Sequence, residues 1–243
     1  MHHVVLDRWS RGASVLHGLD ARAKTVAVTV LLIAIGTAQH ALLSLSLAYF
    51  ALIAMAIVAA RVPLTAALKR AAVVLPFTLV FAAISIAAGE PVRALVLVAK
   101  SYLSALAVLL LVSTTPLTEL LRGLERMGVP RYLLMVVQFL YRYLFVISEE
   151  AQHMRAAALA KSGSVHRALF RRSPFTAAAG ALGVLFARSY GHADGVHQAM
   201  LARGFQGHFH TLSRRNFRGS DALFAAAASL IVIGLRLAVE GLA

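Results

Sequence analysis

The sequence predicts an all-α, polytopic integral membrane protein with about five transmembrane helices and a cytoplasmic helical module. Hydrophobic residues make up 60% of its 243 residues and charged residues only 14%, whereas about a quarter of a soluble domain is charged. The apolar residues gather in runs close to the ~20 residues that a helix needs to cross a bilayer. The formal net charge of +14 lies almost entirely outside those runs. This pattern is typical of membrane proteins and disfavours a soluble enzyme or a disordered chain.

Five apolar runs are the candidate transmembrane helices. They are residues 25–38, 41–60, 71–89, 94–115 and 222–239. The first run is short, so we expect the side chains of Arg22 and Lys24 to extend toward the headgroups when it spans the bilayer. The expected organisation is therefore an N-terminal segment, four helices, a long insertion and a last helix. The corresponding ranges are 1–24, 25–115, 116–218 and 219–243.

The distribution of cations predicts the orientation of the chain. Fourteen Lys and Arg residues lie in 116–218, four in 1–24 and three in 61–70, together 21 of the 24. Five spans place these three segments on one side of the membrane, and cations concentrate in cytoplasmic loops. We therefore expect a multi-pass protein of the cell (inner or plasma) membrane with a cytoplasmic N-terminus and a C-terminus outside.

The long insertion reads as cytoplasmic or interfacial helices. Thr115 is the expected cap of a helix that begins at Pro116, and Gly128 is its expected end. Four leucines at helical spacing give this helix one apolar face. They are Leu117, Leu120, Leu121 and Leu124.

A second helix of the insertion begins after Pro130 and meets no breaker before Ser162. Its first half, 132–147, is apolar but contains Gln138 and Arg142. We expect that half to pack against the spans or to lie at the interface, and a sixth span stays open.

The last part of the insertion contains two further expected helices. Pro174 starts the first, Gly191 separates it from the second, and the second ends near Gly204.

Two stripes with i, i+3, i+4, i+7 spacing each end in a cation. They are Met154, Ala157, Ala158 and Lys161, and Val196, Ala199, Met200 and Arg203. Small residues let a helix enter a partner's groove, Met adapts to irregular surfaces, and the cation can bond a carboxylate or carbonyl there. The stripes therefore indicate two docking helices. The alternative is two surface helices with ordinary C-terminal cations that the helix dipole favours.

Several segments, in order, resemble one family. They are Leu19-Asp20-Ala21-Arg22-Ala23-Lys24, Leu120-Leu121-Arg122-Gly123-Leu124, Met127-Gly128-Val129-Pro130, Tyr141-Arg142-Tyr143, Glu149-Glu150-Ala151 and Ala193-Asp194-Gly195-Val196 with Gln198 to Phe205. They resemble the transmembrane T component of energy-coupling factor (ECF) ABC transporters, the EcfT family, and most closely its CbiQ-like branch. The resemblance covers about residues 8–207.

The resemblance implies a non-catalytic subunit that couples two ABC-type ATPases to a small integral-membrane substrate-binding subunit, the S component. It also implies that Ala-Arg-Gly motifs on two coupling helices dock into the ATPases. The second motif falls on Ala202, Arg203 and Gly204 without change. The first falls on Ala160, Lys161 and Ser162 and departs at two positions, and Lys lacks the planar fork of Arg. Ala21 replaces a proline usual in the N-terminal motif, which we expect to soften the entry to the first span.

The implied function is uptake of a vitamin or a transition-metal ion, with cobalt or nickel favoured. ATP would be hydrolysed by the partner subunits, and no cofactor is expected on this chain. A phosphate-binding loop, a H-E-x-x-H sequence and a nucleophile elbow are absent from the sequence. We therefore expect neither an enzyme nor catalytic residues. A self-contained carrier or channel and a polytopic membrane enzyme remain the alternatives.

Other polar residues have less specific readings. The histidines include His2, His3, His208 and His210, and without carboxylates at ligand spacing they predict no metal site. Glu149 and His153 share one helical face, loosely as in a di-metal helix, but a single such motif is weak, and ion pairs of Glu149 and Glu150 with nearby cations such as Arg142 or Arg155 are expected. Asp194 is the expected cap of a helix. Lys100 lies inside an apolar run, where an ionisable residue indicates either function or snorkelling. The cations are not interleaved with aromatics, so nucleic acid is not an expected partner, whereas the lipid bilayer is.

Overall fold

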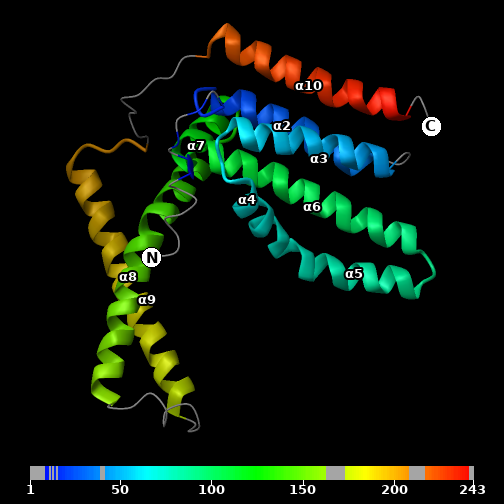
Figure 1. The fold of residues 1–243 in the computed structure, drawn as a ribbon. Helices are drawn as coiled ribbons and strands as arrows, with labels where there is room; N and C mark the ends of the chain where they lie inside the picture. Colours follow the sequence, from blue (N-terminus) through cyan, green and yellow to red (C-terminus); the bar gives the residue numbers. More distant parts are fainter. Residues whose placement is uncertain are drawn as a thin grey trace. The chain divides into compact units, whose positions relative to one another are not determined.

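The computed structural model describes residues 9–10, 12, 14, 16–38, 42–162, 173–207 and 217–240. Helix accounts for 86% of the structure, and the described residues form no strand. The chain divides into two compact units (Figure 1). Unit 1 comprises residues 1–128 and 213–243, and unit 2 comprises residues 129–212. The expected all-α class is confirmed.

Unit 1 contains most of the helices. They are α2 (Ala21–Thr37), α3 (Leu42–Ala59), α4 (Leu64–Ala71), the 3₁₀ turn η1 (Ala72–Val74), α5 (Leu75–Ala87), α6 (Pro91–Thr114), α7 (Leu117–Arg126) and α10 (Gly219–Glu240). Helix α6 contacts α2, α3, α4 and α5, while α10 packs on α2 and α3 (Figure 1). The core therefore lies among α2, α3 and α6, with Tyr49, Ile53 and Leu106 almost wholly buried.

Within the residues that the structure describes, four helices are long and apolar enough to cross a membrane. They are Leu64–Ala87, Pro91–Thr114, Arg131–Ala160 and Gly219–Val239. The part of α3 from Ser44 to Ala59 is also apolar but is shorter than these four. Length and composition thus define a multi-pass membrane protein. The segment 131–160, which the sequence left open as an additional span, is among the four.

The third apolar run differs from the sequence expectation at its start. Residues 61–70 were expected to be a loop, but α4 begins at Leu64 and carries Lys69 and Arg70. The 3₁₀ turn η1 follows, because Pro76 has no N–H and its ring clashes with the carbonyl four residues earlier, that of Ala72. The helix therefore continues with a changed pitch instead of starting at residue 71.

A short turn joins α5 to α6. Gly89 has φ of +84°, and the Glu90 N–H donates to the Ser85 carbonyl oxygen at 3.0 Å. Only glycine takes this left-handed conformation without steric cost. Pro91 follows as the first residue of α6, a position where its missing N–H has no helical partner. The sequence Gly89-Glu90-Pro91 therefore reverses the chain between two long apolar helices.

Unit 2 consists of two long helices, α8 (Arg131–Ser162) and α9 (Ser173–Ala202). Helix α8 has the expected bounds. The expectation of two helices between Pro174 and Gly204 is wrong, because α9 continues without a break through Gly191. Asp194 consequently lies in the interior of α9 and does not cap a helix. A glycine in a helix interior costs only about 1 kcal/mol, and no proline follows Pro174 in this segment.

Candidate partner-docking site

Helix α9 ends at Ala202, and Arg203 and Gly204 form the turn that closes it. The Gly204 N–H donates to the Leu201 carbonyl at 2.9 Å, and the Phe205 N–H donates to the Met200 carbonyl at 3.0 Å. Gly204 has φ of +74°. This is the Schellman arrangement, in which a left-handed glycine closes the helix. Arg203 lies at the turn and is exposed.

The second stripe continues this end of α9 along one face. Val196 and Met200 are half-buried against α8, whereas Ala199, Ala202 and Arg203 are exposed. An exposed alanine next to an exposed cation leaves room for a partner to approach closely. Ala199, Ala202, Arg203 and Gly204 are therefore accessible to a partner, whereas Val196 and Met200 of the stripe face α8.

The first stripe lies on the last turns of α8. Met154 is half-buried, and Ala157, Ala158 and Ala160 are exposed. Lys161 and Ser162 belong to the helix, but their side chains lie outside the described part of the chain.

The two motifs lie at opposite ends of unit 2. The first half of α8 packs against the second half of α9, so the helices run antiparallel and their C-terminal ends point in opposite directions (Figure 1). A 30-residue helix is ~45 Å long at ~1.5 Å per residue. The structure therefore separates the two cation-ended motifs instead of bringing them together.

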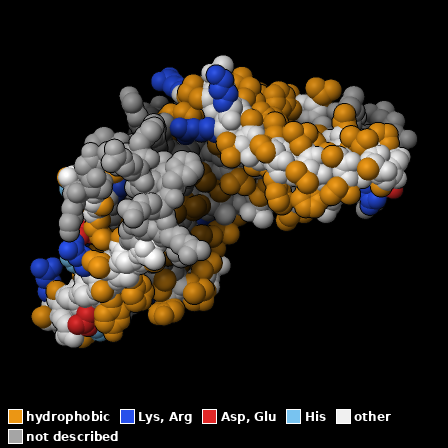
Figure 2. All heavy atoms as spheres, turned by 90° about the horizontal axis from the view of Figure 1, so that it is seen from below, with side chains coloured by type: hydrophobic (Ala, Val, Ile, Leu, Met, Phe, Trp, Pro, Cys, Tyr) orange, Lys and Arg blue, Asp and Glu red, His pale blue; other side chains and the backbone are white. Residues whose placement is uncertain are grey.

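An apolar groove with a volume of about 420 Å³ runs between α8 and α9. Val136, Leu140 and Phe139 are among its α8 residues, and Val196 and Met200 are among its α9 residues. In the part of unit 2 that the structure describes, Leu134 is the only buried hydrophobic residue. Hydrophobic side chains accordingly cover much of the surface in Figure 2. Such a face requires a bilayer or another protein to cover it.

Ion pairs connect α8 to α9 and α8 to itself. Glu150 pairs with a cation as expected, but the cation is Arg188 of α9 and not one of its own helix. Glu149 pairs with His153 at 3.9 Å, and both side chains are about three-quarters exposed. The described residues include no group of three or more His, Asp or Glu side chains that could hold a metal ion. His2, His3, His208 and His210 lie outside them.

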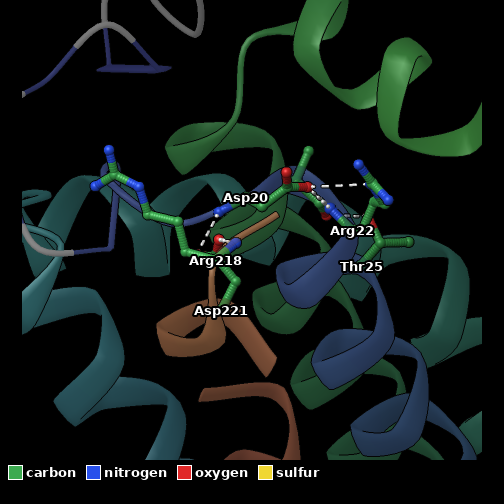
Figure 3. A network of polar contacts seen from close by, with 6 residues as sticks. Asp20, Arg22, Thr25, Arg218 and Asp221 are labelled. Atoms are coloured by element: carbon green, nitrogen blue, oxygen red, sulfur yellow. Dashed lines mark hydrogen bonds and ion pairs between the residues drawn. The ribbon is translucent and has the colours of Figure 1, made fainter. Parts of the chain in front are cut away.

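A buried polar junction joins the first turns of α2 and α10 (Figure 3). Asp20 caps α2 by accepting from the Arg22 N–H at 2.9 Å. Asp221 accepts from the Arg218 N–H at 2.9 Å and, with its other oxygen, from the Asp20 N–H at 3.1 Å. Asp20 is 6% exposed and Asp221 is 5% exposed. Positive helix ends favour carboxylates in these positions.

Lys24 lies one turn further along α2 and is 4% exposed. Its Nζ donates to the Thr114 carbonyl at 2.9 Å and to Thr115 Oγ1 at 3.3 Å. Lys24 therefore satisfies the C-terminal end of α6 and does not extend toward headgroups, which corrects the snorkelling expectation. Thr115 is the C-cap of α6, and Pro116 is the N-cap of α7, so the expected capping role of Thr115 is also wrong.

Two more cations cap the C-terminal end of α2. Lys100 donates from Nζ to the carbonyl oxygens of Gly36 at 3.2 Å and Ala38 at 2.6 Å. Arg236 donates to Thr37 Oγ1 at 2.6 Å and to its carbonyl at 3.1 Å. The last carbonyls of a helix lack helical partners, so a cation within an apolar helix is well placed there. Lys100 therefore caps a helix, a role that neither reading of the sequence included.

The sequence did not predict that Asp221, Thr114 and Arg236 take part in these junctions. Their signals were present in the sequence, since Asp221 lies three residues after Arg218 as in a capping box, and Arg236 interrupts an apolar run. Their partners are up to 201 residues away in the chain, so sequence periodicity could not identify the pairing.

The helices, their apolar surfaces and these junctions define a multi-pass, all-helical membrane protein with an exposed pair of long helices. Residues 12–212 match the sequence model of the CbiQ family, described as "Cobalt transport protein". The chain belongs to this family. It is similar to the protein named "Cobalt transport protein CbiQ" of Rhodobacter capsulatus, with 31% identity over 157 residues. That alignment covers 65% of this chain and 59% of the relative.

Proposed function

We propose that this chain is the energy-coupling transmembrane subunit of an ECF-type ABC importer. In this role it transmits a conformational change from two ABC-type ATPase subunits to a membrane-embedded S component. The observation that carries the proposal is the uncovered helix pair of unit 2. Among the described residues of α8 and α9, Leu134 is the only buried hydrophobic side chain, so partners or lipid must complete the environment of this pair.

The two ends of this helix pair are the proposed ATPase-docking sites. Each ATPase would receive one C-terminal motif, Ala160-Lys161-Ser162 on α8 and Ala202-Arg203-Gly204 on α9. The antiparallel arrangement supports this assignment because it presents the motifs at two separate places. ATP binding draws the ATPases together, and the motion reaches the membrane only when the docking contacts differ between the two nucleotide states.

The apolar groove between the docking sites is the proposed contact for the S component. Its apolar lining suits a membrane-embedded partner, and a shift of α8 against α9 would change its shape. For this role both ends of α8 must lie on the cytoplasmic side, so we propose that α8 lies at the membrane interface. Arg142 within its apolar half and the pair Glu149 and Glu150 beyond it support this placement over a sixth span.

We propose a transition-metal ion as the cargo, with cobalt favoured over nickel or a vitamin. Support comes from the description of the family and from the name of the Rhodobacter relative. We further propose that the N-terminus is cytoplasmic in the cell membrane, as the cation distribution indicates. The chain itself would bind no ATP, and its partners would hydrolyse it.

The Arg203→Glu variant tests the docking assignment. It reverses the charge of an exposed side chain, so we expect loss of ATPase co-purification from mild detergent, or ATP hydrolysis that is no longer coupled to uptake of radiolabelled cobalt. Arg126→Glu is the matched control, because Arg126 is also an exposed cation in the last turn of a helix, but the apolar stripe of α7 consists of leucines and does not end in this cation. If both variants behave alike, the helix dipole explains Arg203 and the docking role is wrong.

Lys161→Arg belongs to the same experiment. We expect unchanged or tighter ATPase association, since arginine adds a planar fork for paired hydrogen bonds. A clear loss would mean that the first motif lies elsewhere in the chain. Uptake of cobalt by this chain alone, reconstituted without partners, would instead support a self-contained carrier.

A further inference from the structure

Unit 1 contains a cavity of about 320 Å³ among α2, α3, α6 and α10. It lies toward the end of unit 1 where α2 and α10 begin and α3 and α6 end. Its wall is apolar apart from Lys24 and Thr114, which bond to one another. Five alanines make the space, because larger side chains at these positions would fill it. They are Ala27, Ala56, Ala59, Ala227 and Ala228.

The cavity is closed at its back and opens sideways. Ile53 and Val232 are 1% and 3% exposed and form the deep wall, whereas Met55 and Ile231 are 66% and 50% exposed. The exposed residues belong to α3 and α10, so the mouth lies between these two helices. Helix α10 is one of the four candidate membrane helices. In a bilayer the mouth therefore faces the hydrocarbon, and a water-soluble ligand has no access from that side.

Two exposed arginines lie at the ends of the helices that form the mouth. Arg61 follows α3 by two residues, and Arg218 immediately precedes α10. The C-terminal end of α3 and the N-terminal end of α10 both lie next to the cavity, since Ala59 and Phe224 are part of its lining. Cations beside an apolar pocket between membrane helices match the charge of a phospholipid headgroup.

We propose that this cavity binds one acyl chain of an anionic phospholipid, with the headgroup phosphate at Arg61 and Arg218. The chain lies against the alanines of α3 and α10 and fills space that the protein's own side chains leave open. A void lined by apolar atoms loses dispersion contacts, so the bound chain stabilises the packing of α10 on α3.

Photo-crosslinking of the full chain in nanodiscs tests the site. The probe is phosphatidylglycerol with a diazirine in one acyl chain, diluted into phosphatidylcholine, and the labelled peptides are mapped by mass spectrometry. We expect the label to concentrate on α3 and α10 around Met55 and Ile231. Ala228→Leu and Ala56→Leu fill the cavity from opposite walls, and each should lower that labelling about tenfold, since overpacking excludes the chain.

The control for added volume is Ala226→Leu, an exposed α10 position outside the lining, which should label as the unmodified chain does. Arg61→Gln with Arg218→Gln should abolish the preference for phosphatidylglycerol over an equivalent phosphatidylcholine probe, whereas Arg93→Gln at the other end of unit 1 should retain it. Thermal unfolding of every variant identifies any that fails to fold.

Three results would overturn the proposal. The first is label spread evenly over the exposed apolar helices, including α5. The second is unchanged labelling in both folded cavity-filling variants, and the third is equal labelling by the two lipids in the unmodified chain. None of these measurements involves the partner subunits, so their outcome is separate from the test of energy coupling.

Discussion

Gly204 closes α9 in a conformation that side chains disfavour. Its φ of +74° lies in the left-handed region, and nothing lies within 4 Å of a Cβ added there. Gly204→Ala should therefore destabilise the last turn of α9 by about 1 kcal/mol through backbone strain alone. We expect a larger relative loss of ATPase binding than of thermal stability, because Arg203 would lose its fixed position.

Gly204→Asn is the control for that prediction, because asparagine tolerates the left-handed region. It should retain most of the ATPase binding measured by co-purification. Equal losses for the alanine and asparagine variants would show that the absence of a side chain matters, and not the backbone conformation.

Asp221 is expected to be essential for the junction of α2 with α10. Asp221→Ala removes the acceptor of the buried Asp20 N–H, and an unsatisfied buried donor costs about 1–3 kcal/mol. Thermal unfolding in detergent should therefore show a clearly lower midpoint for this variant. Asp194→Ala changes an exposed carboxylate of α9 and should leave the midpoint unchanged. A midpoint equally unaffected by Asp221→Ala would contradict the junction.

Single cations illustrate what could be predicted from the sequence and what could not. The concentration of Lys and Arg outside the apolar runs predicted the class of protein correctly. The individual roles of Lys24, Lys100 and Arg236 were not predictable, because each bonds the end of a helix distant in sequence. A helix terminus in an apolar bundle needs such partners, but composition does not say which cation supplies them.

At the scale of elements, α9 shows that a glycine in the sequence is a weak predictor of a helix end. Gly191 was expected to end a helix, yet α9 continues through it. Helix breaks follow from proline or from a left-handed glycine, and neither occurs at this position. The length of α8 was predicted well because Pro130 lies just before it and a breaker was expected only at its other end.

Gly191→Ala tests whether the continuity of α9 matters. No neighbouring atom lies within 4 Å of a Cβ added at this position, so the variant should stabilise α9 by about 0.5–1 kcal/mol relative to glycine. We expect a raised unfolding midpoint and unchanged uptake of radiolabelled cobalt by the assembled transporter. Loss of uptake despite higher stability would identify Gly191 as a hinge.

At the scale of the whole molecule, the two units differ in how much they bury. Unit 1 has a core that includes residues of α2, α3, α6 and α10, whereas the described part of unit 2 buries a single hydrophobic residue. The sequence predicted an insertion of 116–218, and contacts place α7 with unit 1 instead of with the long helices. Gly123 accounts for this, since a Cβ there would lie 3.2 Å from that of Ala21 on α2.

The exposed groove of unit 2 is the proposed contact for the S component, and a polar substitution in it tests that contact. Leu140→Gln places a polar group in the groove, where Leu140 is 64% exposed, so we expect reduced co-purification of the S component with the ATPases still bound. Leu133→Gln on the same helix is exposed but outside the lining, and should have no such effect. Loss of the ATPases together with the S component would mean that the groove does not separate the two interactions.

The contact between Asp20 and Asp221 links the beginning of the chain to its last helix. The two portions of unit 1 thus hold each other in place, and residues 129–212 leave the bundle after Gly128 and return to it before α10. Because both ends of residues 129–212 join unit 1, we expect that replacing this segment with a short linker leaves unit 1 folded. Circular dichroism and thermal unfolding of the shortened protein in detergent would check this.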